Sequence, residues 1–397
     1  MSQSVVEMTK DLVLAQIQTG SIFPEDAASG WWDAAILLAR TNRARQGGRV
    51  TDAREAGTAS DDVLVERVEP DDAEGIAAWH GVFAAALRDA SADHPVLTLP
   101  ELTALVRPGS APIEHELWLM HSGGRPVGAA RLDVFLEDNT DLLEVHLGVH
   151  PAEQHRGHGR RLVEAVTRRA AELGRHQVVG AVQEPPDGSE NRAMRFAAAA
   201  GARRALGEMR RVLDLTTLSG DLLARLRAEA EEKATGYTLV TWAGRVPDEH
   251  VDGYARLLGR IMTDAPQGEL DLEASAWDAD RVRKREALLA SQGRRSVAAL
   301  ARVGEDGPLV AYSDVGVSSH DPDNAFQWDT LVQPEHRGHR LGLLVKVAVV
   351  ELLRTEAPRA RHLHTWNADD NGYMIAINDK LGFRPAQRES AWRLDLP

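Results

Sequence analysis

The chain has 397 residues, 43% of them hydrophobic, and a formal net charge of −14. This length allows two or three hydrophobic cores, and the acidic balance disfavours nucleic acid as a partner while suiting a cationic amine. Cysteine is absent, which excludes disulfides, thiolate metal ligands and a cysteine nucleophile. The sequence shows no signal-peptide pattern and no apolar run long enough to span a membrane, so we expect a cytoplasmic protein without membrane contact.

Residues 1–60 are expected to form a helical extension that ends in a linker. Helix-like patterns cover residues 9–19 and 24–45, and the second opens with Pro24 before acidic residues, which suits a helix start. Residues 47–61 are polar and rich in Gly, Ala and Thr, a composition typical of linkers.

Residues 61–217 are expected to form a mixed α/β domain. Hydrophobic periodicity predicts, in chain order, a strand at 63–68, helices at 71–89 and 99–106, strands at 115–121, 126–135 and 142–149, a loop and helix up to Leu173, a strand at 177–183, a helix at 190–200 and a strand near 208–215. Strands interrupted by helical crossovers favour one mixed sheet with helices packed on it. Residues 218–235 follow as a linker helix, opened by a possible N-cap at Ser219.

Residues 236–397 repeat this pattern. Taking Pro334 as the counterpart of Pro151 gives an offset of 183 (334 − 151), and the same offset carries Gln154 to Arg337 without a gap. The predicted elements are a strand from 237, helices at 248–263 and 277–291, strands at 296–303, 308–317 and 325–332, a loop and helix, the strand RHLHTWN and the helix DDNGYMIAINDKLGF. The chain therefore contains the same α/β unit twice.

The stretch HLGVHPAEQHRGHGRRLVEAVTRRAAEL, residues 146–173, predicts a phosphate site in the first unit. A strand that passes through a glycine-containing loop into a helix directs free backbone N–H groups and the positive end of the helix dipole at one point. Gly157 and Gly159 matter because a side chain there would hold the backbone away from a pyrophosphate. A nucleotide phosphotransferase is disfavoured, since no P-loop lysine accompanies the loop.

Both loops resemble the acyl-CoA loop of the GCN5-related N-acetyltransferase (GNAT) family, Gln/Arg-x-x-Gly-x-Gly/Ala. The first copy fits at Gln154, Gly157 and Gly159, whereas the second has Arg340 where the first glycine belongs. The Arg340 side chain could obstruct the cradle, or its guanidinium could pair with a phosphate. The layout resembles double acetyltransferases of the mycothiol synthase type, which implies two tandem GNAT-like domains with an N-terminal helical extension.

The resemblance also implies where acyl-CoA binds: in a V-shaped gap between the strand before each loop and the strand after the loop helix. It carries the cofactor-binding role, in the first copy, to Val149, Gln154, His155, Arg156, Gly157, His158, Gly159, Arg160 and Asn191. In the second copy it carries that role to Val332, Arg337, Gly338, His339, Arg340, Leu341, Gly342, Leu343, Asn367 and Asn371.

Candidate bases are sought on the strand before each loop, because the resemblance implies that alternate residues there face the acceptor. Polar residues in an apolar strand are costly to bury without a reason, although they could also pair with a neighbouring Arg. The 183-residue offset relates Glu144 and His146 to Gln327 and Asp329. Asp329 is the preferred base and Glu144 the next, because the first copy offers no polar set like that of Asp329 with Asn367 and Asn371.

The proton donor for the leaving thiolate is less clearly indicated. The position of the family's tyrosine acid, four residues before the glycine of the last helix, is Ala197 in the first copy and Asn378 in the second. Neither residue can act as that tyrosine, so Tyr373, a His or water would have to protonate the thiolate. Histidines 146, 150, 155 and 158 invite a metal interpretation, but no carboxylate or Cys set completes it in the sequence, and we expect no metal.

The leading interpretation is an enzyme that transfers an acyl group, acetyl or longer, from acyl-CoA directly to the amine of a small molecule. Because each copy departs from the family pattern, we expect one active copy and one degenerate copy. The alternative from another class is a non-catalytic acyl-CoA sensor or interaction module, which release of CoA with a panel of amines would exclude. The sequence does not indicate the amine, the acyl chain length or the oligomeric state.

Overall fold

The computed structural model describes residues 63–91, 93–107, 113–185, 187–264 and 276–397. The helical extension predicted over residues 1–60 lies outside them. Within the described residues, no helix is long and apolar enough to cross a membrane.

The first repeat contains the elements that its hydrophobic periodicity predicts. They are β1 (Val63–Val68), α3 (Ala73–Ala90), α4 (Leu99–Leu105), β2 (Ile113–Ser122), β3 (Arg125–Phe135), β4 (Leu142–Val149), η1 (Pro151–Glu153), α5 (His158–Glu172), β5 (Gln177–Glu184), α6 (Arg192–Ala199) and β6 (Arg203–Asp214). Local chemistry sets the helix starts: the Asp72 side chain accepts a hydrogen bond from Gly75 N at 3.0 Å, and Thr98 and Glu101 form a capping box.

The second repeat follows the linker helix α7 (Gly220–Glu231) and has the same order of elements. They are β7 (Tyr237–Ala243), η2 (Asp248–His250), α8 (Val251–Asp264), α9 (Ala279–Ser291), β8 (Arg294–Val303), β9 (Leu309–Ser318), β10 (Asn324–Val332), η3 (Pro334–His336), α10 (Leu341–Glu356), β11 (His362–Ala368), α11 (Gly372–Leu381) and β12 (Arg384–Asp395). The mixed α/β class and the duplication are thereby confirmed, and β12 is a strand that the sequence pattern did not predict.

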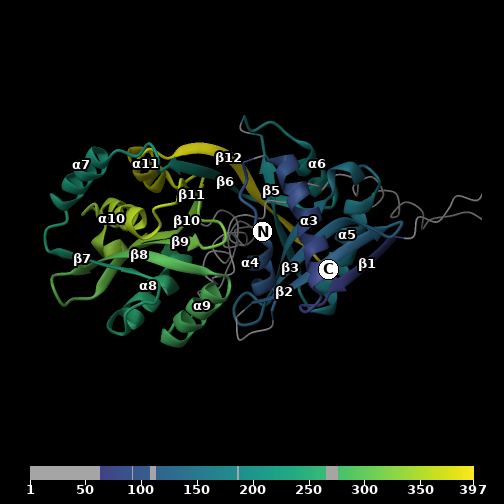
Figure 1. Cartoon of the computed structure of the whole chain (residues 1–397), viewed down its shortest axis with the longest axis horizontal. Helices are drawn as coiled ribbons and strands as arrows, with labels where there is room; N and C mark the ends of the chain where they lie inside the picture. Colours follow the sequence, from purple (N-terminus) through teal and green to yellow (C-terminus); the bar gives the residue numbers. More distant parts are fainter. Residues whose placement is uncertain (1–62, 92, 108–112, 186, 265–275) are drawn as a thin grey trace, which may run out of the picture.

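All described strands form one sheet in which the last strand of each repeat is exchanged. The order is β1-β2-β3-β4-β5-β12-β6-β11-β10-β9-β8-β7. Strand β12 pairs with β5 of the first repeat, β6 pairs with β11 of the second, and β6 and β12 pair with each other in the middle. Figure 1 shows these two strands crossing between the halves of the molecule. The domain boundaries at 61–217 and 236–397 remain a proposal, because the exchanged strands β6 and β12 hydrogen-bond each segment to the other.

Helices cover both faces of each half of the sheet. In the first repeat, α3 and α4 pack on alternate residues of β2 such as Leu117 and Leu119, while α5 packs on the other face with Met120. In the second repeat, α8 and α9 cover one face and α10 with α7 cover the other. Strand β4 is consequently buried along its whole length. A polar side chain on such a strand requires a polar partner.

A buried ion pair also joins the repeats. Glu101 of α4 accepts a hydrogen bond from Arg294 Nε of β8 at 2.7 Å, and Ser318 of β9 donates to the same carboxylate oxygen. Burial would raise the pKa of Glu101, but Arg294, Ser318 and Thr98 together lower it below its usual value. Its contribution to stability is therefore present above the pKa of an unfolded-chain glutamate and is lost as the pH falls below it.

We expect Glu101→Gln to lower the free energy of unfolding at pH 7 by about 3 kcal/mol, because it removes the carboxylate charge that the buried Arg294 guanidinium binds. Chemical denaturation at pH 7 and at pH 4 measures the effect, and the gap between variant and wild type should shrink at pH 4. The control is Glu114→Gln, at a carboxylate half-exposed beside Arg67, where a change below about 1 kcal/mol is expected. Equal effects at the two positions would contradict the assignment.

Candidate active sites

Two parallel strand pairs, one in each repeat, diverge after a short ladder of backbone hydrogen bonds. Strands β4 and β5 pair only from Leu142–Glu144 to residues 177–179, and β10 and β11 pair only from residues 324–326 to 362–364. In the described part of the chain no ladder joins either pair beyond these residues, so each pair opens toward its glycine-containing loop. A gap between two strands exposes backbone N–H and C=O groups that an extended ligand arm can use.

The first loop lies where β4 leads into α5. Gln154 Nε2 donates to the Val149 carbonyl at 3.3 Å, and this bond closes the turn from the strand into the loop. Gly157 is the N-cap of α5 with φ +82°, a left-handed conformation that favours glycine. Arg192, the first residue of α6, reaches back to Gln154 Oε1 at 3.2 Å and to the ring of His155. The loop before α5 is therefore fixed by contacts to β4 on one side and to α6 on the other.

The second loop repeats this geometry with one difference. Arg337 Nε donates to the Val332 carbonyl at 3.4 Å, the counterpart of the Gln154 bond. Arg340 is the N-cap of α10 with φ +55°, at the position of Gly157, and a non-glycine residue there costs about 1–2 kcal/mol. Its guanidinium binds the linker helix α7, at Glu229 O (3.0 Å) and Glu229 Oε1 (3.1 Å). The side chain therefore extends onto α7 and pairs there with a carboxylate.

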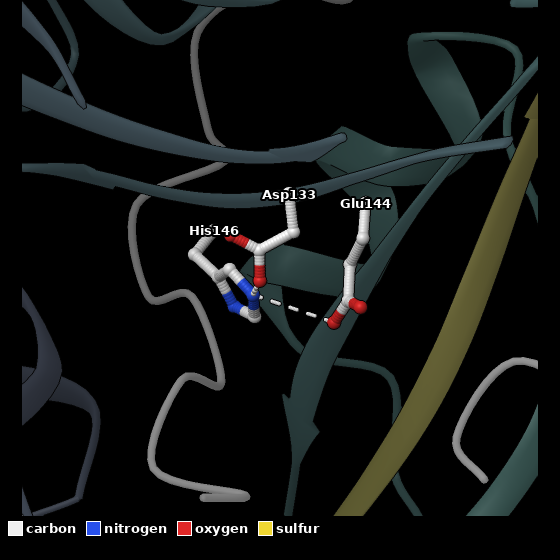
Figure 2. A group of neighbouring side chains, drawn as sticks. All are labelled: Asp133, Glu144 and His146. Carbon is white, nitrogen blue, oxygen red and sulfur yellow. Dashed lines mark hydrogen bonds and ion pairs between the residues drawn. The ribbon is translucent and has the colours of Figure 1, made fainter. Parts of the chain in front are cut away.

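A buried charged cluster lies on β3 and β4 of the first repeat. Figure 2 shows the ring of His146 next to the carboxylates of Asp133 and Glu144. Its Nε2 lies 3.3 Å from Asp133 Oδ2 and 3.3 Å from Glu144 Oε1. Asp133 also accepts hydrogen bonds from Arg131 Nε (3.0 Å) and interacts with His115 Nδ1 (2.7 Å). The expectation that the first copy lacks a comparable polar set is wrong. The missed signal was the charged alternation of Arg131 and Asp133 in the otherwise apolar β3.

In this cluster two carboxylates lie next to His146, a possible set of metal ligands that the sequence pattern does not reveal. One ligand atom each from Asp133, Glu144 and His146 lies within 4.8 Å of the others. However, both oxygens of Asp133 are engaged by Arg131, and burial of this carboxyl is outweighed by Arg131 and His115, which hold its pKa well below the usual range. A guanidinium at that distance would repel a dication. We interpret the cluster as an ion-pair network.

A second buried cluster lies on β9 and β10, beneath α8 and α9. Asp314 accepts hydrogen bonds from Tyr254 (2.8 Å), Arg285 (3.2 Å) and the backbone N–H of Asp329 (3.2 Å). Burial and the Asp314 carboxylate raise the pKa of Asp329 to about 8, against the opposing effect of Arg285. Tyr312 is close enough to lower this pKa slightly, yet neither its hydroxyl nor Asp329 Oδ2 has a hydrogen-bond partner of normal geometry among the described residues.

A β-bulge changes the equivalence between the two clusters. Between Gln327 and Thr330, β10 has one residue more than its partner β9. Upstream of the bulge, Phe326 pairs with Gly316 as Glu144 pairs with Asp133, so Glu144 corresponds to Phe326 (offset 182). The pairing of Glu144 with Gln327 through the 183-residue offset was therefore wrong. Gln327 instead donates to Ser313 Oγ and to the Asp314 carbonyl on β9.

The remaining candidates separate into exposed and buried positions. Tyr373 is 60% exposed at the start of α11, whereas Asn378 is fully buried. Asn378 accepts a hydrogen bond from Lys346 Nζ (2.6 Å) and donates to Asn367 Oδ1 (2.7 Å) on β11. Lys346 did not stand out in the sequence, because it lies within the apolar run of α10.

Asn191 and Asn371 hold equivalent structural places in the two repeats. Each is the N-cap of its helix and accepts a hydrogen bond from the third residue that follows, Met194 and Met374 respectively. Asn191 also donates to the Gln183 carbonyl of β5 at 2.6 Å. Both asparagines thus fix the turn from the strand after the loop helix into the next helix.

Comparison with known proteins agrees with this geometry. Residues 114–201 match the family model described as Acetyltransferase (GNAT) domain. A tandem GNAT protein from the clavulanic acid biosynthesis pathway, solved without AcCoA, is 29% identical with a TM-score of 0.69, over 84% of this chain and 98% of that one. The chain has the fold of a tandem GNAT protein. The family match covers the first glycine-containing loop, and the similarity to the tandem protein extends over most of the chain.

More distant structures share the fold alone. A GCN5-related N-acetyltransferase from Sphaerobacter thermophilus is 17% identical with a TM-score of 0.59, over 85% of this chain and 97% of that one. A glucosamine N-acetyltransferase region of a fungal multi-domain GH3 beta-N-acetylglucosaminidase is 13% identical with a TM-score of 0.58, over 86% of this chain and 39% of that one. No curated protein matches this tandem GNAT chain.

Proposed function

We propose that this tandem GNAT protein transfers an acyl group, most simply acetyl, from acyl-CoA to the amine of a small molecule, and that the second repeat carries out the chemistry. The observation that supports this assignment is the buried Asp329 carboxyl beside the opening between β10 and β11. Its Oδ2 has no hydrogen-bond partner of normal geometry among the described residues, although Tyr312 is close enough to lower its pKa, whereas both oxygens of Asp133 in the first repeat are already paired. An unpaired buried carboxyl can accept a proton from an incoming ammonium.

The proposed chemistry needs no covalent intermediate. An amine arrives protonated and transfers one proton to the Asp329 carboxylate. The neutral nitrogen then attacks the thioester carbonyl, the thiolate leaves, and the nitrogen loses a second proton to water as the amide forms. A pKa of about 8 leaves only a minority of Asp329 ionised at pH 7, but it matches the base to a working pH near neutrality. The arriving ammonium would further favour the ionised carboxylate through its charge.

In this proposal the first repeat binds acyl-CoA without turning it over. Its loop keeps both glycines and its α5 N-terminus is presented by Gln154 and Arg192, but its polar cluster is closed upon itself. The donor chemistry of both loops fits a pyrophosphate, because backbone N–H groups and a helix start face it. If CoA binds to the second repeat, its phosphates would lie at the start of α10, beside the Arg340–Glu229 pair.

Release of CoA thiol from acetyl-CoA, measured with a panel of primary amines, tests the function. Turnover with at least one amine is expected, and soaked acetyl-CoA should occupy the gap of the second repeat in a density map. Binding in both gaps without thiol release for any amine would favour a non-catalytic acyl-CoA sensor instead. Density for CoA in the first gap only would move the chemistry away from Asp329.

A further inference from the structure

Lys346 is a buried cation that the proposed acyl transfer has not used. It lies on α10, is 1% exposed, and its Nζ donates to Asn378 Oδ1 at 2.6 Å and stands 5.4 Å from the ring of Phe383. Among the described residues it forms no ion pair with a carboxylate. A buried ammonium without a counter-charge is costly, so the site must either keep the amine neutral or receive negative charge from elsewhere.

The fold itself does not require this lysine. The first repeat has Val163 (346 − 183) and Ala197 (378 − 181) at the same positions; Ala197 lies within an apolar core and Val163 is partly buried against it. The two repeats therefore use one backbone arrangement with an apolar interior in the first and a hydrogen-bonded polar chain in the second. A polar chain that the fold can omit calls for a functional explanation.

The polar chain ends on β11, in the part of this strand that no longer pairs with β10. Asn378 donates to Asn367 Oδ1, and Asn367 lies on β11 beyond His364, the last residue of that strand that pairs with β10. Lys346, Asn378 and Asn367 thus connect α10, α11 and the diverging end of β11. Tyr373, the other proton donor that the sequence suggested, is 60% exposed at the start of α11. It is not part of the hydrogen-bonded series formed by Lys346, Asn378 and Asn367.

We propose that Lys346 protonates the leaving thiolate of acyl-CoA in the second repeat, with Asn378 holding its ammonium group in place. The inference rests on the proposed acyl transfer. As the acceptor nitrogen bonds to the thioester carbon, the C–S bond breaks with its electron pair on sulfur, and Nζ of Lys346 gives its proton to that sulfur. The first proton of the acceptor ammonium goes to Asp329 before the attack, the nitrogen loses a second proton to water as the amide forms, and solvent restores the ammonium of Lys346.

The electrostatic surroundings suit this role. Burial lowers the pKa of Lys346 to about 7, so the ammonium and the neutral amine coexist near neutral pH. From α11 it faces Asn378, and Phe383 lies beyond that helix. The charged groups of α7 and α10 nearby are paired with each other: Arg227 with Glu351, and Glu229 with Arg340 and Lys380. The remaining strands packed on α10, β7 to β10, place apolar residues of the core against it.

The test is the pH profile of turnover for Lys346→Met, with Val163→Met in the first repeat as the matched control. In wild type, turnover should fall as the pH rises past the pKa of Lys346, because the donor loses its proton. Lys346→Met should abolish this alkaline limb and lower turnover at pH 7 by about tenfold; the loss is modest because a thiolate is a good leaving group that water can protonate. Val163→Met should keep both the rate and the limb.

A second variant covers the case in which Lys346→Met fails to fold. Asn378→Leu removes the acceptor of the ammonium hydrogen bond, so the alkaline limb should move to lower pH. An alkaline limb unchanged in either variant overturns the assignment of Lys346. Wild-type protein that releases no CoA with any amine would instead refute the underlying acyl transfer, and the two failures are thereby distinguished.

Discussion

Asp329→Asn is expected to lower turnover by about two orders of magnitude while leaving CoA affinity nearly unchanged. The substitution keeps the shape of the side chain and removes only its ability to accept a proton, because an amide is not a base. Since the carboxyl lies under α8 and α9, away from the loop that starts α10, phosphate binding should be unaffected. Steady-state release of CoA thiol and calorimetric titration with CoA measure the two quantities separately.

The matched control is Glu144→Gln on the corresponding strand of the first repeat, where little loss of turnover is expected. Glu144 is already bound to His146 within the closed cluster, so its loss affects packing more than proton transfer. If the Glu144 variant is inactive and the Asp329 variant turns over normally, the first repeat is the active copy. The similarity to tandem GNAT proteins would be unaffected by that result.

The pH dependence gives an independent check on Asp329. Because burial and Asp314 raise the pKa of Asp329 to about 8 while burial lowers that of Lys346 to about 7, wild-type turnover should be bell-shaped, with its maximum between these two values. Asp329→Asn should lose the acidic limb of this profile. The folded-state pKa lies above the value of 3.8 for an ordinary aspartate, so the stability linked to the protonated form is lost as the pH rises toward about 8. Thermal unfolding of Asp329→Asn should accordingly depend less on pH, which also shows whether the variant is folded.

Gly157→Val is expected to weaken CoA binding to the first repeat by about tenfold or more. Gly157 has φ +82° at the N-cap of α5, a conformation that a β-branched residue adopts only under strain, and the branched side chain would stand where the phosphates approach the backbone. Calorimetry with CoA at the first site measures the loss. Full affinity in this variant would exclude the loop as the phosphate site.

The control for backbone strain is Gly174→Val at the other end of α5. Gly174 has φ +67°, and an added side chain there would meet no atom within 4 Å. The two substitutions should therefore cost similar stability, measured by thermal unfolding, while only the Gly157 variant loses CoA affinity. Equal losses of affinity in both variants would mean that strain in α5, rather than contact with phosphate, explains the effect.

The sequence alone was sufficient for the duplication, the class of the fold and most element positions. The 183-residue offset, the apolar periodicity and the glycines before the loop helix are local properties, and local backbone chemistry responds to them directly. Gly157 and Arg340 both adopt the left-handed conformation at their helix starts because the loop geometry is the same in both copies.

Tertiary structure alone decided which strands and side chains meet. The apolar pattern of a strand indicates that it is buried but not which strand it pairs with, so the exchange of β6 and β12 could not be predicted from periodicity. A one-residue bulge in β10 likewise moved the counterpart of Glu144 from Gln327 to Phe326. The constant sequence offset does not reveal this, because the extra residue of the bulge appears only in the strand pairing. Asp133 and Lys346 gained their partners on other elements only through packing, because His115 and His146 reach Asp133 from β2 and β4, and Asn378 reaches Lys346 from α11.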